Sequence, residues 1–144
     1  MKYFSLNHNA PEVSFQEAVV RGLAPDKGLY FPKSINQLPE SFFENIETLD
    51  NASIAYEAIK QFVGDEIPQS DLKNILEDVL SFDFPVVELN DSISALELYH
   101  GPTMAFKDVG ARFMARCLGY FNGQNDTKEN VTVLVATSGD TGGA

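Results

Sequence analysis

Apolar residues recur at helical spacing along much of the first eighty positions. Within residues 52–63 they fall one turn apart, and Gly64 then offers a C-terminal stop. A second apolar stripe runs through residues 71–80, with Ser70 in position to cap it. This pattern predicts two amphipathic helices whose apolar faces belong to a core.

Two further helix starts are indicated by capping-box patterns. Ser14 stands three residues before Glu17, and Ser41 stands three residues before Glu44. In such a box, the hydroxyl and the carboxylate each accept a hydrogen bond from a backbone N–H at the helix start. We therefore expect a helix after Ser14 and another over residues 42–49.

Strand-like patterns become more common towards the second half of the chain. An early short strand is expected at residues 29–31, and two more at 86–89 and 95–99. A helix is expected from Lys107 to about Phe121, followed by a polar loop to residue 130. The apolar run at 131–136 is typical of a parallel strand that is covered on both faces.

This order of elements predicts an α/β fold in two parts. Residues 1–83 form a mostly helical N-terminal domain, and residues 84–144 form the first strands and helix of an α/β layer. A buried parallel strand normally leads into a helix that crosses back over the sheet, and few residues remain for that helix here. We therefore expect a truncated chain, the N-terminal part of a larger α/β enzyme.

The composition is that of a soluble protein, with 44% hydrophobic and 22% charged residues. No apolar stretch is long enough to span a bilayer, and the N-terminus does not look like a signal peptide. The net charge of −11 disfavours nucleic acid and anionic membranes as partners. The single cysteine, Cys117, fits a reducing compartment, so we expect a cytoplasmic protein.

Lys107 has an unusual setting for a lysine. It follows a Gly-Pro-Thr turn and three apolar residues, Met104, Ala105 and Phe106, and it opens the predicted helix. Desolvation and the positive end of the helix dipole both disfavour the charged form of such a side chain. A neutral amine can attack a carbonyl, as Schiff-base chemistry requires. The alternative is a lysine whose stem packs on apolar surface while its ammonium reaches water.

A second candidate site is the loop at residues 137–142, which is rich in glycine and hydroxyl side chains. It follows the predicted buried strand, where the backbone N–H groups of such a loop can bind an anion. Asp140 adds an acceptor among these donors. Many glycine-rich turns bind nothing, and this one matches neither a mononucleotide nor a dinucleotide phosphate motif.

Other kinds of site have weaker support. The two histidines, His8 and His100, have no clustered cysteine or acidic partner in the sequence, so no metal site is expected. Cys117 falls on the apolar face of a predicted helix and is expected to be an inert thiol. Arg112 remains a candidate anion ligand, whereas Arg116 is expected on a solvated face.

Three segments together resemble the threonine synthase family. Its members are pyridoxal-phosphate enzymes of the tryptophan-synthase-β-like fold (fold type II). The first is His-Gly-Pro-Thr-Met-Ala-Phe-Lys-Asp at 100–108, followed by Gly110, Arg112 and Phe113. The second is Ser-Gly-Asp-Thr-Gly at 138–142, and the third is the N-terminal stretch 14–30. The resemblance covers the whole chain in order and spacing.

The resemblance implies roles for both candidate sites. Lys107 would form a Schiff base with pyridoxal 5′-phosphate, Phe106 would lie near the cofactor ring, and Asp140 would lie near its 3′-oxygen. The cradle for the cofactor phosphate would lie beyond residue 144. The residues that would hold the substrate carboxylate are Thr137, Ser138, Gly139, Asp140, Thr141 and Gly142.

The resemblance also implies a reaction, the conversion of O-phospho-L-homoserine and water to L-threonine and phosphate. This makes the full-length protein a carbon–oxygen lyase acting on a phosphate ester, at the last step of threonine biosynthesis. We expect the 144 residues alone to be inactive and to self-associate through exposed apolar surface. The alternatives are a related pyridoxal-phosphate lyase or phosphatase with another phosphorylated substrate, and a non-catalytic interaction domain.

Overall fold

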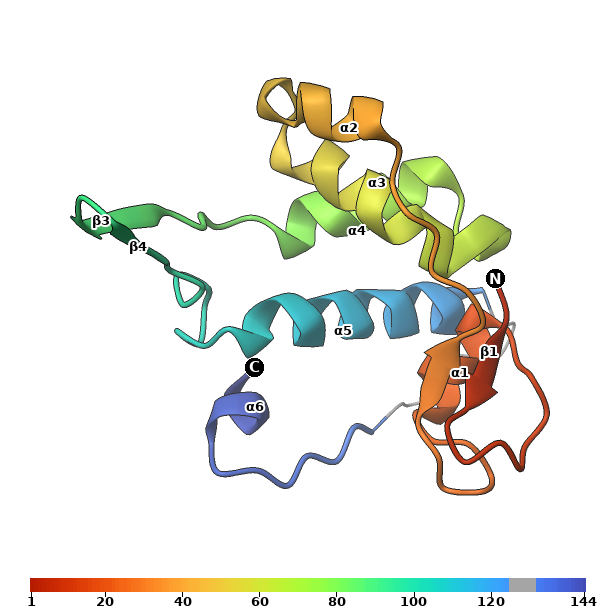
Figure 1. Ribbon diagram of the computed structural model, residues 1–144. Helices are drawn as coiled ribbons and strands as arrows, with labels where there is room; N and C mark the ends of the chain where they lie inside the picture. Colours follow the sequence, from red (N-terminus) through yellow and green to blue (C-terminus); the bar gives the residue numbers. More distant parts are fainter. Residues whose placement is uncertain (125–131) are drawn as a thin grey trace. The chain divides into compact units, whose positions relative to one another are not determined.

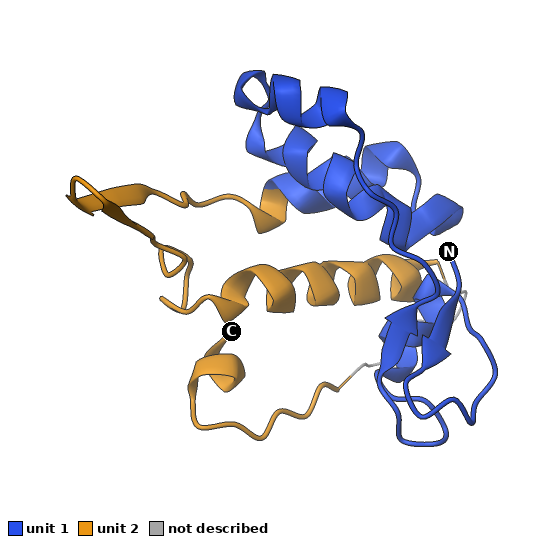
Figure 2. Ribbon diagram, viewed as in Figure 1, with its two compact units in different colours: residues 1–77 blue, residues 78–144 orange. Residues whose placement is uncertain are grey.

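The computed structural model describes residues 1–124 and 132–144 (Figure 1). The chain divides into two compact units, Met1–Glu77 and Asp78–Ala144 (Figure 2). Most of the regular structure in the described residues is helical, and two small antiparallel sheets accompany the helices, one in each unit. None of the helices in the described ranges is long and apolar enough to cross a membrane.

The first unit begins with a two-stranded sheet. Strand β1 (Tyr3–Ser5) pairs antiparallel with β2 (Tyr30–Pro32), and Phe4 lies opposite Phe31. The predicted early strand is therefore confirmed, shifted by one residue. Helix α1 (Phe15–Arg21) lies between the two strands in the sequence.

Hydrogen bonds join the end of β1 to the turn that precedes β2. The Ser5 hydroxyl donates to Asp26 Oδ1 at 2.6 Å, and the Gly28 N–H donates to the same oxygen at 3.0 Å. The hydrogen bond from Ser5 lowers the pKa of Asp26 below the usual range. A Cβ at position 28 would collide with the Ser5 hydroxyl, so only glycine fits there.

The predicted capping box at Ser14 is only half formed. The Ser14 hydroxyl accepts a hydrogen bond from the Glu17 N–H at 3.1 Å, but the Glu17 carboxylate pairs with Arg21 at 2.8 Å. The Glu66 carboxylate accepts from the N–H groups of the first two helical residues instead, at 2.9 and 2.8 Å. A residue some fifty positions away in the sequence thus completes this helix start.

The remainder of the first unit is helical. Asp50 caps the longest of these helices by accepting from the Ser53 N–H at 2.7 Å, and Gly64 ends it as predicted. The elements in chain order are α2 (Glu40–Asn45), η1 (Ile46–Thr48), α3 (Asn51–Val63), η2 (Gly64–Glu66) and α4 (Gln69–Val79), whose last two residues fall in the second unit.

The predicted caps at Ser41 and Ser70 are wrong, because both serines lie inside a first helical turn. Each helix starts directly after a proline, Pro39 or Pro68, whose carbonyl accepts the first helical hydrogen bond. Proline lacks a backbone N–H, and none is required at the position just before a helix, so proline is well tolerated there. Buried residues of the first unit include Tyr3, Val13, Phe15, Val63, Ile67, Leu72, Ile75 and Leu76.

Beyond the end of α4, the described residues of the second unit form a hairpin and two helices. Strand β3 (Val86–Asn90) pairs antiparallel with β4 (Ile93–Leu96), with an irregular register between Glu88 and Asn90. The hairpin confirms the two predicted strands, although the second strand begins and ends earlier than expected. Helix α5 (Lys107–Gly123) starts at the predicted residue, and the short α6 (Asp140–Gly143) follows near the C-terminus.

The predicted strand at residues 131–136 is wrong for the part that is described. Residues 132–136 have no regular structure, and Leu134 is 91% exposed. An apolar run becomes a strand only where another strand accepts its backbone hydrogen bonds, and no described strand pairs with this one. Residue 131 and most of the predicted loop at 122–130 lie outside the described residues, while 122 and 123 belong to α5.

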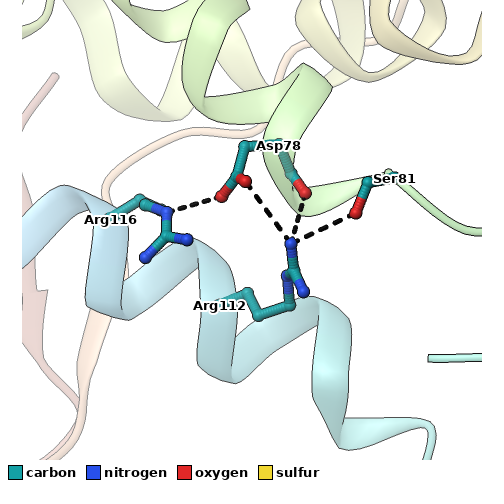
Figure 3. Close-up of polar contacts among 4 residues, drawn as sticks. All are labelled: Asp78, Ser81, Arg112 and Arg116. Atoms are coloured by element: carbon teal, nitrogen blue, oxygen red, sulfur yellow. Dashed lines mark hydrogen bonds and ion pairs between the residues drawn. The ribbon is translucent and has the colours of Figure 1, made fainter. Parts of the chain in front are cut away.

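Two arginines on α5 bind the end of α4 and Ser81, two residues beyond it (Figure 3). Arg112 donates to the Asp78 carbonyl at 2.6 Å and to the Ser81 hydroxyl at 3.2 Å, and Arg116 donates to the Asp78 carboxylate at 2.5 Å. The hydrogen bond from Arg116 lowers the pKa of Asp78. Arg112, a candidate anion ligand, thus binds the end of α4 instead. Arg116 is half-exposed, as expected, but it also forms an ion pair with Asp78.

Candidate active site

The loop before α5 folds back on itself and determines where the helix begins. The Met104 N–H donates to the Gly101 carbonyl at 3.0 Å, and the Asp108 N–H donates to the Ala105 carbonyl at 3.1 Å. Met104 adopts a φ of 55°, which is unfavourable for a residue with a side chain. Phe106 stands at the N-cap without a capping side chain, and Lys107 is the first helical residue.

Asp108 ties this loop to the first turn of α5. Its carboxylate accepts the Thr103 hydroxyl at 2.7 Å and the Thr103 N–H at 3.0 Å, and the residue is only 2% exposed. Burial raises the pKa of Asp108, but the hydrogen bonds from Thr103 and the Ala105 backbone, together with the positive charge of Arg112, outweigh it, so the pKa lies below the usual 3.8. A Cβ at Gly101 would collide with this carboxylate and lie 2.9 Å from Asp108 Cβ.

Lys107 is oriented towards the C-terminal segment of the same unit. Its Nζ lies 3.9 Å from Asp140 Oδ2 and 4.9 Å from the centroid of the Phe106 ring. The side chain is 40% exposed, and that of Asp140 is 65% exposed. The structure therefore brings together the three residues that were expected near a cofactor. Lys107 is, however, more exposed than the apolar residues around it in the sequence predicted.

A cavity of about 700 Å³ opens beside Lys107. Four of the predicted site residues line it: Phe106 and Lys107 at the start of α5, and Thr141 and Gly142 in α6. The remaining wall is apolar or small, and comprises Val109, Gly110, Ala111, Met114, Ala115, Leu118, Val133, Val135 and Ala144. This volume and apolar character are typical of pockets for small molecules.

The loop at 137–142 uses part of its own hydrogen-bonding capacity. The Thr137 hydroxyl accepts from the Gly139 N–H at 3.2 Å and from the Gly142 N–H at 2.9 Å. These bonds close the first turn of α6, where Asp140 is the first residue. Thr137, Ser138 and Gly139 are exposed and do not line the cavity, so the loop contributes to it through its second half.

His100 and Cys117 are placed away from this arrangement. His100 Nε2 lies 2.6 Å from Glu97 Oε2, and its ring stacks on Tyr99 at 4.8 Å. The hydrogen bond from His100 lowers the pKa of Glu97. Cys117 is fully buried, and burial raises the pKa of its thiol to about 12, so it is inert as predicted. Residues 1–124 and 132–144 hold no cluster of three metal-ligating side chains.

Sequence reasoning identified Lys107 but missed the residues that hold its loop. Thr103 and Asp108 are linked through two hydrogen bonds, and neither was expected to have a role. A hydroxyl residue five positions before an acid at a helix start is a possible signal. The arrangement presents a primary amine at the edge of an apolar cavity, with a carboxylate and an aromatic ring close by. Such a site can bind an aromatic aldehyde through the amine.

Comparison with known families gives a match over the first part of the chain. Residues 2–80 match the family model described as the threonine synthase N terminus. The threonine synthase of Buchnera aphidicola subsp. Baizongia pistaciae is 39% identical over 145 residues, covering the whole chain and 33% of that protein. That of Escherichia coli strain K12 is 39% identical over 144 residues, again covering 33% of its length.

Solved structures agree with this result. The crystal structure of threonine synthase from Escherichia coli superposes with a TM-score of 0.88 at 40% identity, covering 99% of this chain and 32% of that one. The PLP-bound threonine synthase from Brucella melitensis gives 0.82 at 33% identity, covering 86% and 28%. The chain spans about a third of the length of these relatives. The match to their N-terminal part confirms the predicted fold class.

Proposed function

Since this chain belongs to the family of the threonine synthase N terminus, we propose that it carries the cofactor lysine and part of the substrate site of a threonine synthase. The observation that carries the proposal is the position of Lys107. Its amine lies 3.9 Å from Asp140 at the edge of a 700 Å³ apolar cavity. Membership of the family supports the type of enzyme, and this geometry supports a covalent role for the Lys107 amine.

The residues around the cavity fit pyridoxal 5′-phosphate in part. The volume accommodates a small aromatic ring, and the apolar wall suits the faces of that ring. Lys107 would hold the aldehyde carbon, Phe106 would contact the ring, and Asp140 would face the 3′-oxygen. No residue of this chain is assigned to the cofactor phosphate. When bound, the cofactor supplies an electron sink for chemistry at the substrate α-carbon.

The chain's own residues would bind and orient the substrate and move protons. We propose that the Lys107 amine, once released from the cofactor, takes the proton from the substrate α-carbon and later returns a proton to the carbon chain. Thr141 and Gly142, which line the cavity, would contact the substrate carboxylate, with Thr137, Ser138, Gly139 and Asp140 completing the binding loop. Met114 and Leu118 in the cavity wall would limit the access of water.

The proposed overall reaction converts O-phospho-L-homoserine and water to L-threonine and phosphate. It is a carbon–oxygen lyase reaction on a phosphate ester and the last step of threonine biosynthesis. We assign residues 1–83 to the N-terminal domain and 84–144 to the start of the catalytic domain. A cytoplasmic location is proposed as well, because the only cysteine is buried and the chain cannot form an internal disulfide.

The first test asks where the cofactor attaches. The full-length protein is incubated with pyridoxal phosphate and reduced with borohydride, and the modified lysine is identified by peptide mass spectrometry. We expect modification at Lys107 and its loss in Lys107→Ala. Lys60→Ala is the matched control, because the Lys60 side chain is 45% exposed, close to the 40% of Lys107. Equal labelling of the Lys107→Ala and wild-type proteins would refute the proposal.

The second test asks which substrate is used. The full-length protein is supplied with O-phospho-L-homoserine, and threonine and phosphate are measured together. Threonine formation that depends on Lys107 supports the proposed reaction. Phosphate release from another phosphorylated amino acid or amino alcohol, without threonine, would favour a related lyase or phosphatase. An absence of cofactor attachment would favour a non-catalytic domain.

We expect the 144 residues alone to form no threonine. The apolar cavity is open in this chain, and Val133, Leu134 and Val135 are exposed beside it. Exposed apolar surface of this kind favours self-association, which sedimentation analysis at several concentrations can measure. Turnover by the purified 144-residue chain would contradict this expectation.

A further inference from the structure

Asp108 is an unusual buried carboxylate. It is 2% exposed and accepts two hydrogen bonds from the neutral hydroxyl and N–H of Thr103, at 2.7 and 3.0 Å, and it also interacts with the Ala105 backbone and with the positive charge of Arg112. Burying a charged group is costly unless its hydrogen bonds are satisfied. An apolar residue would pack at this helix position at lower cost. The carboxylate therefore has to be explained by what its two hydrogen bonds hold in place.

Those bonds hold the loop before α5 in a tight arrangement. Thr103 is bound through both its hydroxyl and its N–H, so its side chain and its backbone are oriented together. Gly101 packs so closely on the Asp108 carboxylate that no Cβ would fit. Met104, directly after Thr103, is kept at a φ of 55°. A strained residue persists only where its surroundings determine its conformation.

Lys107 lies between this loop and the cavity. It immediately precedes Asp108 in the first turn of α5, and successive helical side chains point about 100° apart. With Asp108 directed into the loop, Lys107 is directed to another side, where it lines the cavity. Rotation of the first helical turn would change both directions together. The Thr103–Asp108 bonds thus oppose any movement of the lysine away from the cavity.

We propose that Asp108 is a positioning residue for Lys107, acting through Thr103 to hold the amine at the cavity edge. This inference rests on the proposed covalent role of Lys107. It assigns a function to a carboxylate that does not itself reach the cavity. Its effect is on the rate at which the amine reacts with an aldehyde, because a reacting group that is misplaced by about 1 Å loses ~100-fold in rate.

The test measures the rate of pyridoxal phosphate attachment in the full-length protein at saturating cofactor, followed by absorbance. Asp108→Asn places an amide N–H₂ group opposite one of the two Thr103 donors, so one hydrogen bond is lost. We expect attachment at Lys107, verified by borohydride mapping, to slow by about 10- to 100-fold. Asp83→Asn, at an exposed aspartate of the same unit, is expected to attach the cofactor at the wild-type rate.

A purely structural role would have a different signature. Partial unfolding lowers the amplitude of the absorbance change, whereas a misplaced amine lowers the rate constant of the folded fraction. Thr103→Val removes the hydroxyl and keeps the side-chain shape, while Thr103→Ser retains both donors. We expect slow attachment in Thr103→Val and the wild-type rate in Thr103→Ser.

The outcomes separate this inference from the proposed function. A wild-type rate in Asp108→Asn overturns the positioning role. If that variant does not fold, the Thr103 pair decides: equal rates in Thr103→Val and Thr103→Ser also overturn it. If the wild-type protein itself does not attach the cofactor at Lys107, the proposed function fails first, and this inference fails with it.

Discussion

The turn around Asp26 in the first unit and the turn around Asp108 in the second are built from the same kinds of parts. In the first, Asp26 accepts from the Ser5 hydroxyl and from a backbone N–H, and Gly28 packs where no Cβ would fit. Lys27, between the aspartate and the glycine, has a φ of 66°. The second turn repeats this set with Thr103, Gly101 and Met104 in the corresponding roles.

The two turns differ in what they connect. Ser5 and Asp26 are 21 residues apart, and their bond joins the end of β1 to the approach of β2. Thr103 and Asp108 are 5 residues apart, and their bonds fold one loop against the first turn of α5. The same arrangement of hydrogen bonds thus connects two strands in the first unit, and in the second unit it fixes the start of the helix that begins at Lys107. Only the second turn is expected to affect chemistry.

The largest expected effects come from filling the two glycine positions. Gly28→Ala and Gly101→Ala each place a Cβ against a side chain that cannot withdraw freely. We expect each to lower the free energy of unfolding by about 1–3 kcal/mol, measured by denaturant titration. Gly101→Ala should also slow cofactor attachment at Lys107 in the full-length protein, and Gly28→Ala should not. Equal attachment rates in the two variants would contradict the distinction between the turns.

Removing the hydroxyl donors should have a smaller effect on stability. Ser5→Ala leaves Asp26 without its shortest hydrogen bond, and Ser5 is fully buried. We expect the melting temperature, measured by scanning calorimetry, to fall by about 3 °C. Thr103→Val should lower it less, because Thr103 is only partly buried and valine keeps the volume of its side chain. A larger loss in Thr103→Val would show that the local turn is the stronger structural element.

Acid should weaken both turns. The pKa of Asp26 and that of Asp108 lie below 3.8 in the folded chain. Between the folded value and 3.8 the unfolded chain binds more protons, so stability rises with pH in that window and is lost as pH falls through it. We expect the urea midpoint to decrease below about pH 4. Asp26→Asn and Asp108→Asn should each make this decrease shallower, with Asp83→Asn as the unchanged control.

The smallest effects are expected at the two residues with positive φ. Lys27→Gly and Met104→Gly relieve an unfavourable backbone conformation, at φ 66° and 55° respectively. Glycine also makes the unfolded chain more flexible, and this offsets most of the gain. We expect changes in the free energy of unfolding within about 0.5 kcal/mol for both. Destabilisation well beyond that range would show that the side chain, rather than the turn conformation, is what the position requires.

Local signals in the sequence predicted most helices and the hairpin. The start of α5 at Lys107, the stop at Gly64 and the strands near residues 86 and 95 all follow from spacing and turn residues close by. The wrong predictions have two causes, one local and one not. Serine caps at 41 and 70 were displaced by neighbouring prolines, and the strand at 131–136 needs a partner strand that the described residues do not provide.

The candidate site shows the same division. Lys107 and the 137–142 loop stand out in the sequence, because a lysine in apolar company and a glycine-rich turn are both local patterns. The cap that Glu66 provides for α1 and the pairing of Asp78 with Arg112 and Arg116 do not stand out, because they join residues far apart in the chain. Such contacts depend on how the elements pack, which periodicity does not encode.

The family, the helix that begins at Lys107 and the identity of the two candidate segments could all be inferred from the amino-acid sequence alone. Motifs and propensities act over a few residues, and these features are equally local. Only the tertiary structure placed the Lys107 amine 3.9 Å from Asp140 and brought both segments to one cavity. It also assigned a use to the buried Asp108, whose cost is offset by hydrogen bonds that exist only when the loop is folded.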